Sequence, residues 1–99
     1  MVKIEIPQEQ LADFCRRYQV RELALFGSVL RNDFRPDSDV DVLIEFEPEA
    51  QVTLLTLSGM QIELTKLLQR SVDLVLLEGL KPVIREAVLS SAETIYAQH

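Results

Sequence analysis

Three short apolar stretches, bounded by residues typical of turns, divide the chain and predict three β-strands. The first runs from Glu22 to Phe26, the second covers residues 39–46 and the third runs from Ser71 to Leu77. In the second stretch apolar side chains alternate with others, as in a strand that buries one face. Gly27 follows the first stretch and Pro48 the second, so we expect both strands to end there.

Apolar residues at helical spacing occupy the segments around these strands. We predict a first helix from Pro7 to Gln19, a long helix from Val52 to Gln69 and a last helix from Pro82 to Ala97. A short helix over Ser28–Asn32 and a turn over Arg35–Ser38 fit the segment between the first two strands. The apolar surface of the long helix is broader than one stripe, which indicates that both sides are buried or that one side meets a partner.

This order of elements predicts a single domain over residues 1–99 with an α/β (α+β) fold. The second and third strands are joined by a helix, so we expect them to be parallel, with a right-handed crossover. The first strand must run antiparallel to the second if Gly27 is to meet the start of the second strand. The expected architecture is therefore a small mixed three-stranded sheet with helices mainly on one face.

Charge and cysteine content narrow the classes of function. The net charge of −6 argues against a protein that binds the nucleic-acid backbone, so we expect a protein partner and no direct nucleic-acid binding. The longest uncharged stretch, residues 50–62, is too short and too polar to cross a membrane. The single cysteine, Cys15, excludes an internal disulfide, which fits a cytoplasmic location.

Two residue pairs and the spacing between them indicate a candidate binding site. Gly27-Ser28 ends the first strand, and Asp39-x-Asp41 opens the second after ten intervening residues. Asp39 and Asp41 share one face of the strand, where their carboxylates repel each other unless a cation lies between them. Mg²⁺ prefers such oxygen ligands, while the N–H groups and hydroxyl of Gly27-Ser28 suit a neighbouring phosphate. The spacing predicts a metal–nucleotide site.

Asp73 is a third candidate ligand, near the start of the third strand. A parallel pairing places the start of this strand beside the start of the second, so that Asp73 completes a triad with Asp39 and Asp41. Two alternatives remain open: Asp73 also fits a solvent-facing acid on an edge strand, and the Asp39–Asp41 pair also fits a solvated strand start.

The sequence Leu-Phe-Gly-Ser at residues 25–28, followed by Asp39-x-Asp41 and a later aspartate, resembles the nucleotidyltransferase superfamily that includes DNA polymerase β. In length the chain is similar to the minimal nucleotidyltransferases, which are commonly antitoxins of HEPN-domain ribonuclease toxins. The resemblance implies a polymerase β-like fold and the transfer of AMP from ATP to a tyrosine of a HEPN toxin, which silences that toxin.

The same resemblance assigns roles to individual residues. Gly27-Ser28 would hold the nucleotide phosphates, and Arg31 would contact phosphate, although a surface salt bridge is an alternative for Arg31. The Asp39-x-Asp41 pair would bind two Mg²⁺ ions. Asp73 would ligate the catalytic metal and help to deprotonate the acceptor hydroxyl.

Two other functions remain open at this stage. The first is an antitoxin of weak catalytic activity that acts by occlusion, because Val29 and Asn32 depart from the family pattern. The second is a small-molecule nucleotidyltransferase, although those enzymes usually carry a further helical domain. The apolar surface expected over residues 52–69 and 83–95 fits a protein partner, either another protein or a second copy of this chain.

Overall fold

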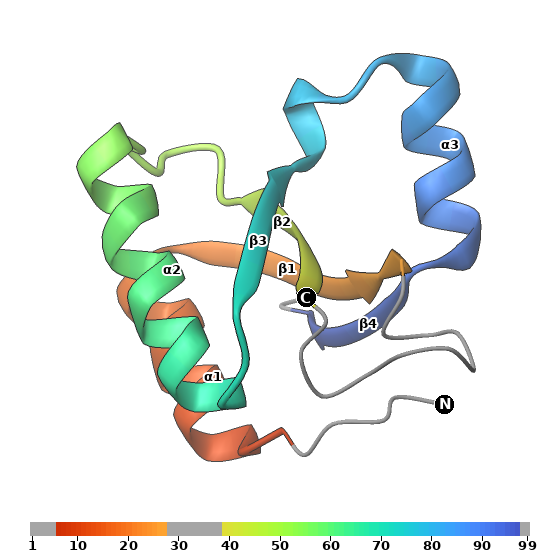
Figure 1. The fold of residues 1–99 in the computed structure, drawn as a ribbon. Coiled ribbons are helices and arrows are strands. Elements are labelled where there is room, and N and C mark those ends of the chain that lie inside the picture. Colours follow the sequence, from red (N-terminus) through yellow and green to blue (C-terminus); the bar gives the residue numbers. More distant parts are fainter. Residues whose placement is uncertain (1–5, 28–38, 98–99) are drawn as a thin grey trace.

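A mixed four-stranded sheet lies at the centre of the computed structural model, which describes residues 6–27 and 39–97 (Figure 1). The predicted short helix at Ser28–Asn32 and turn at Arg35–Ser38 lie outside these residues. The elements along the described chain are α1 (Gln8–Arg17), β1 (Val20–Phe26), β2 (Val40–Phe46), α2 (Leu54–Leu68), β3 (Val72–Leu76), the 3₁₀ helix η2 (Leu77–Gly79), α3 (Pro82–Ser91) and β4 (Glu93–Ala97).

The strands lie in the order β3-β2-β1-β4. β1 is antiparallel to β2 and β2 is parallel to β3, which confirms both predicted pairings. An irregularity between Val20 and Glu22 shifts the register of β1 against β2. β1 starts at Val20, two residues before the predicted start at Glu22.

The prediction of three strands is wrong, because the chain forms a fourth strand where we predicted the end of the last helix. α3 ends at Ser91, and Ala92 already has an extended backbone with ψ 146°. β4 then pairs antiparallel with the outer edge of β1. Its central residues, Thr94, Ile95 and Tyr96, are β-branched or aromatic, and the unpaired edge of β1 offers them hydrogen-bonding partners.

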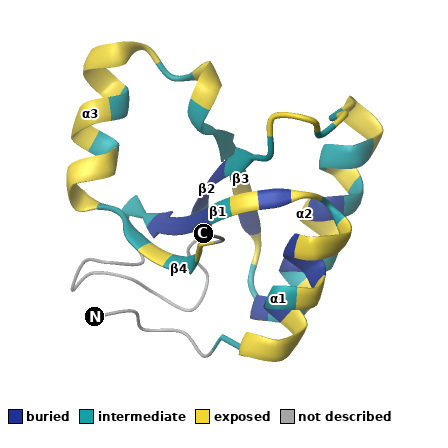
Figure 2. Ribbon diagram, turned by 180° about the vertical axis from the view of Figure 1, so that it is seen from behind, coloured by how far each residue is buried: buried dark blue, intermediate teal, exposed yellow. Residues whose placement is uncertain are grey.

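Helices α1 and α2 cover one face of the sheet and enclose the hydrophobic core with it (Figures 1 and 2). Thr53 begins α2 by accepting a hydrogen bond from the Thr56 amide at 3.2 Å. Arg17 of α1 binds Glu63 of α2 at 2.9 Å. The fully buried side chains are Leu11, Phe14, Cys15, Val20, Leu23, Leu25, Val40, Val42, Ile44, Met60 and Leu64.

α3 lies on the other side of the sheet, well separated from α1 and α2 (Figures 1 and 2). None of its residues is buried, and Val83 is 81% exposed. The amino end of α2 is similarly open, since Leu54 and Leu55 are 83% and 85% exposed. No helix within the described ranges is long and apolar enough to span a membrane.

Candidate active site

Asp41 of β2 and Asp73 of β3 are direct partners across the two parallel strands. The residues on either side of Asp41, Val40 and Val42, point into the core, as does Val72. Because successive side chains alternate between faces, both carboxylates point to the face that α1 and α2 leave uncovered. Neighbouring strands lie about 4.8 Å apart, so the register places two acids side by side at the beginning of their strands.

Gly27 brings the end of β1 against the same carboxylate. Phe26 is the partner of Asp41 across the antiparallel pair, and Gly27 follows it with a φ of +78°. This left-handed conformation suits glycine, which has no Cβ atom. A Cβ added at Gly27 would overlap Oδ2 of Asp41 and lie 3.3 Å from its Cγ. The close approach of backbone to carboxylate therefore requires glycine at this position.

The remaining candidate residues divide into two groups. Asp39 is exposed and directly precedes β2, on the side of the strand that Asp41 shares. Ser28 and Arg31 lie outside the described residues, as do Val29 and Asn32. The described structure thus brings Gly27, Asp41 and Asp73 together, with Asp39 two positions before Asp41.

The carboxylate donors fit a hard divalent cation. Asp41 and Asp73 offer only oxygen ligands and lie in register, and Asp39 supplies a further carboxylate at the start of β2. Over residues 6–27 and 39–97, no three His, Cys, Asp or Glu side chains are gathered into a ready metal-binding cluster. The protein part of the site is therefore a carboxylate pair with a third acid nearby.

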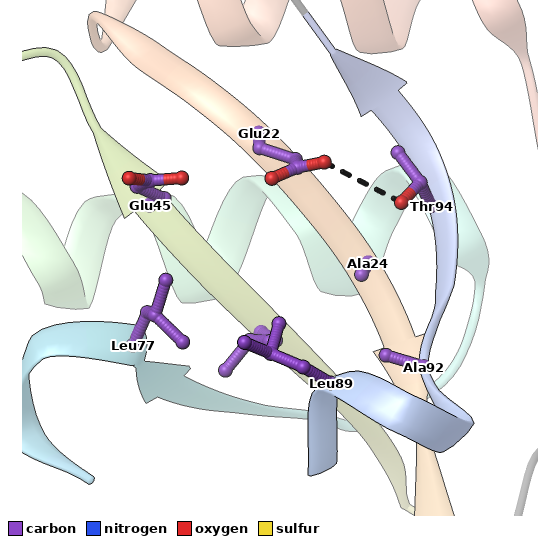
Figure 3. A pocket seen from close by; sticks show the side chains of 8 residues that line it. Glu22, Ala24, Glu45, Leu77, Leu89, Ala92 and Thr94 are labelled. Atoms are coloured by element: carbon purple, nitrogen blue, oxygen red, sulfur yellow. Dashed lines mark hydrogen bonds between the residues drawn. The ribbon is translucent and has the colours of Figure 1, made fainter. Parts of the chain in front are cut away.

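The carboxyl end of α3 approaches the same sheet face near Ala24 (Figure 3). Leu89 and Ala92 close a small cavity of about 50 Å³, which is too small for a nucleotide. At its rim Thr94 donates a hydrogen bond to Glu22 at 3.5 Å, and Glu22 pairs across the strands with Glu45. The cavity is lined by Glu22, Ala24, Leu43, Glu45, Leu77, Leu89, Ala92 and Thr94. This cavity is therefore separate from the Gly27–Asp41 contact.

A larger groove of about 600 Å³ follows β3, at the edge of the sheet. Asp73 lies in its lining, together with residues from the first half of α2 and from the segment after β3. Gln61 of α2 donates a hydrogen bond to the carbonyl of Val72 at 2.8 Å, next to Asp73. Sequence reasoning missed both the groove and Gln61, because nothing in the local pattern shows which helix residue reaches the edge of β3.

Another charged cluster joins α1 and α2 away from the carboxylate pair. The pKa of Glu63 is lowered mainly because Arg17 donates hydrogen bonds to it, and Tyr18 adds to the effect. The pKa of Tyr18 is raised, chiefly by its hydrogen bond to Glu63. Burial raises the pKa of the Cys15 thiol to about 12, so this cysteine is a protonated core residue. The pair of Arg17 and Glu63 links α1 to α2.

Known proteins similar to this chain share both its sequence and its fold. The nucleotidyltransferase domain family matches residues 8–95. The protein adenylyltransferase MntA of Thermococcus cleftensis is 40% identical over 80 residues, which are 81% of this chain and 77% of that protein. A solved structure described as a minimal nucleotidyltransferase is 39% identical, with a TM-score of 0.71, and the match covers 86% of this chain and 85% of the other.

A more distant likeness concerns the fold alone. The complex of a tri-AMPylated Shewanella oneidensis HEPN toxin with an MNT antitoxin matches at 19% identity with a TM-score of 0.59. The match covers 92% of this chain and 70% of that chain.

Proposed function

This chain belongs to the nucleotidyltransferase domain family, and we propose that it transfers AMP from ATP to a hydroxyl group of a protein partner, acting as an antitoxin. Membership rests on a match over residues 8–95 and on a relative at 40% identity. The name of that relative, a protein adenylyltransferase, supports AMP as the transferred group and a protein as the acceptor.

The register of Asp41 and Asp73 is the observation that carries the proposal. The two acids meet on the open face of the sheet, and the backbone of Gly27 packs against one of them. Phosphoryl-type transfer needs mainly positioned groups and compensation of charge, and this geometry supplies oxygen ligands beside a tight glycine turn. A merely solvated strand start would need neither the register nor the glycine.

The residues are proposed to act as follows. Asp39 and Asp41 would hold two Mg²⁺ ions, with Asp73 as a further ligand of the catalytic metal, while Gly27-Ser28 and Arg31 would bind the phosphates of ATP. When bound, the metal supplies positive charge that offsets the phosphates and the pyrophosphate leaving group. Asp73 helps to take the proton from the acceptor hydroxyl, whose oxygen forms a bond to the α-phosphorus as the bond to pyrophosphate breaks.

The proposed partner is a HEPN-domain toxin, and the proposed acceptor is one of its tyrosines. The complex of an AMPylated HEPN toxin with an MNT antitoxin, which shares this fold, supports that choice. The exposed apolar side chains of α2 and α3 are consistent with a protein partner. We place the protein in the cytoplasm, where a single buried thiol is compatible with reducing conditions.

The proposal is tested on the protein encoded by the adjacent gene, taken as the candidate partner. This protein is incubated with this chain, ATP and Mg²⁺, and its intact mass is measured by mass spectrometry. We expect the partner to gain one or more AMP units. The Asp39→Ala/Asp41→Ala variant should add none, whereas Glu45→Gln, on the same strand and face as Asp41, should act as the wild type. Transfer at the wild-type rate by the double variant would refute the assigned roles.

Formation of a tight complex without any mass gain would instead support occlusion of the partner without chemistry. Modification of a small hydroxyl compound in place of the protein would support a small-molecule enzyme.

A further inference from the structure

We infer that the groove along β3 is the docking site for the acceptor protein, and that an uncharged, apolar segment next to the modified hydroxyl fills it. This inference rests on the proposed function, because it assumes that the hydroxyl must reach Asp73. It adds the surface that receives the protein and the chemistry of the segment that binds there.

The position of the groove follows from what occupies the rest of the sheet face. The nucleotide is proposed to lie near Gly27 and Asp41, and a small cavity closed by Leu89 and Ala92 lies over the same face at Ala24 (Figure 3). β3 is the edge strand, and no described strand lies beyond it. A polypeptide can therefore approach Asp73 along the outer edge of β3.

The groove leads from Asp73 to an apolar end. Asp73 and Leu76 are three residues apart on the strand, which is a distance of about 10 Å. Leu54 of α2 and Leu80, after η2, also line the groove, and Leu54 is 83% exposed. An extended segment of three or four residues spans this distance from the modified hydroxyl. An apolar side chain at its far end can then bury Leu54.

The chemistry of the lining defines the occupant. Ser58 and Gln61 are the neutral polar residues of the described lining, Asp73 is the single acid, and that lining contains no Lys or Arg. Gln61 donates a hydrogen bond to the Val72 carbonyl, which holds its side chain beside Asp73. An acidic segment finds no countercharge there, whereas an apolar one replaces exposed leucine surface with contacts.

Leu54 and Leu55 provide a matched test, because both are more than four-fifths exposed on α2 and only Leu54 lines the groove. The affinity of the full-length chain for the full-length neighbouring gene product is measured by calorimetry, and AMP transfer by intact mass. We expect Leu54→Asp to weaken the complex by about tenfold or more and to slow transfer, with ATP affinity unchanged. Leu55→Asp should stay within about threefold of the wild type.

A second variant fills the groove without removing an apolar residue. Ser58→Arg places a long cation at an exposed position of the lining and should weaken the complex as Leu54→Asp does. The inference is overturned if both groove variants bind like the wild type, or if Leu54→Asp and Leu55→Asp lose equal affinity. It is also overturned if Leu54→Asp changes only self-association in sedimentation velocity, since the groove then receives a second copy of this chain.

Failure of the proposed function gives a different pattern. If Asp41→Asn transfers AMP as well as the wild type, the assigned chemistry is wrong whatever the groove variants do. If Asp41→Asn is inactive while both groove variants bind and transfer normally, the chemistry stands and the docking site is wrong.

Discussion

The backbone of Gly27 packs directly against the carboxylate of Asp41, across the antiparallel pair of β1 and β2. The contact joins the small-residue turn and the acidic strand start, the two halves of the motif that sequence analysis singled out. The contact leaves no room for a Cβ atom at Gly27, and the backbone of Gly27 has a φ of +78°. Glycine is therefore required at this position for both a steric and a conformational reason.

Gly27→Ala is expected to displace the Asp41 carboxylate and to slow AMP transfer by about 100-fold, because small displacements of catalytic groups are costly. The left-handed backbone adds a stability cost of about 1 kcal/mol. Rates are measured by intact mass and stability by urea unfolding. Gly79→Ala is the control, since a Cβ at Gly79 meets nothing within 4 Å. Equal rates for the two variants would show that the Gly27 contact does not position Asp41.

Asp73→Asn is expected to remove the thermal stabilisation that Mg²⁺ and ATP together give the wild-type protein, because a proposed carboxylate ligand is lost. The melting temperature without ligands should change little, since Asp73 is exposed. EDTA should abolish both the stabilisation and the transfer by the wild type. A full ligand-induced shift in Asp73→Asn would exclude Asp73 as a ligand.

The ion pair of Arg17 and Glu63, which links α1 to α2, predicts that the stability of the fold depends on pH. Arg17 and Tyr18 lower the pKa of Glu63 in the folded protein. The ionised carboxylate therefore contributes its full stabilisation at pH values above its ordinary pKa of 4.5. That contribution is lost as the pH falls through the lowered pKa. Glu63→Gln should therefore be less stable than the wild type near neutral pH, and the difference should vanish in acid.

Thermal unfolding of both proteins between neutral pH and strong acid measures this difference. The exposed Glu78→Gln serves as the control and should follow the wild type throughout. A constant gap between Glu63→Gln and the wild type would mean that the pair contributes packing rather than charge.

Gln69→Gly is expected to stabilise the protein by about 0.5 kcal/mol. Gln69 ends α2 with a φ of +55°, a conformation that costs a side-chain-bearing residue more than it costs glycine. Gln10→Gly, at an exposed position inside α1, should instead destabilise by about 1 kcal/mol. Urea unfolding of the two variants tests the opposite signs, and a loss of stability in both would contradict the argument.

The sequence pattern was sufficient for most of the fold and for the acids on adjacent strands. The alternation at Val40, Val42 and Ile44 identified β2, and the helix between β2 and β3 implied that these strands are parallel and start side by side. The exact pairing of Asp41 with Asp73 came only from the structure. The pattern failed at β4, because Ile95 also continues the helical spacing of α3. The pairing that decides between helix and strand is with β1, far away along the chain.

Contacts that depend on three-dimensional packing were not predictable from local pattern. The fit of Gly27 against Asp41 depends on the path of two strands, and the bond from Gln61 to Val72 depends on where α2 crosses the edge of β3. The predicted phosphate contacts of Ser28 and Arg31 fall outside the described residues and stay predictions.

The place of β4 also bears on how the chain folds as it is made. Among the described strands β1 is synthesised first, but one of its edges pairs only with β4, which follows α2, β3 and α3 in the chain. Pairing over such a distance closes a long loop and is slow compared with local helix formation. Until then β1, which ends in Gly27, exposes an unpaired edge open to other chains. Because β4 pairs with this edge last, weakening β4 should reduce the yield of folded protein before it reduces the activity of the molecules that fold.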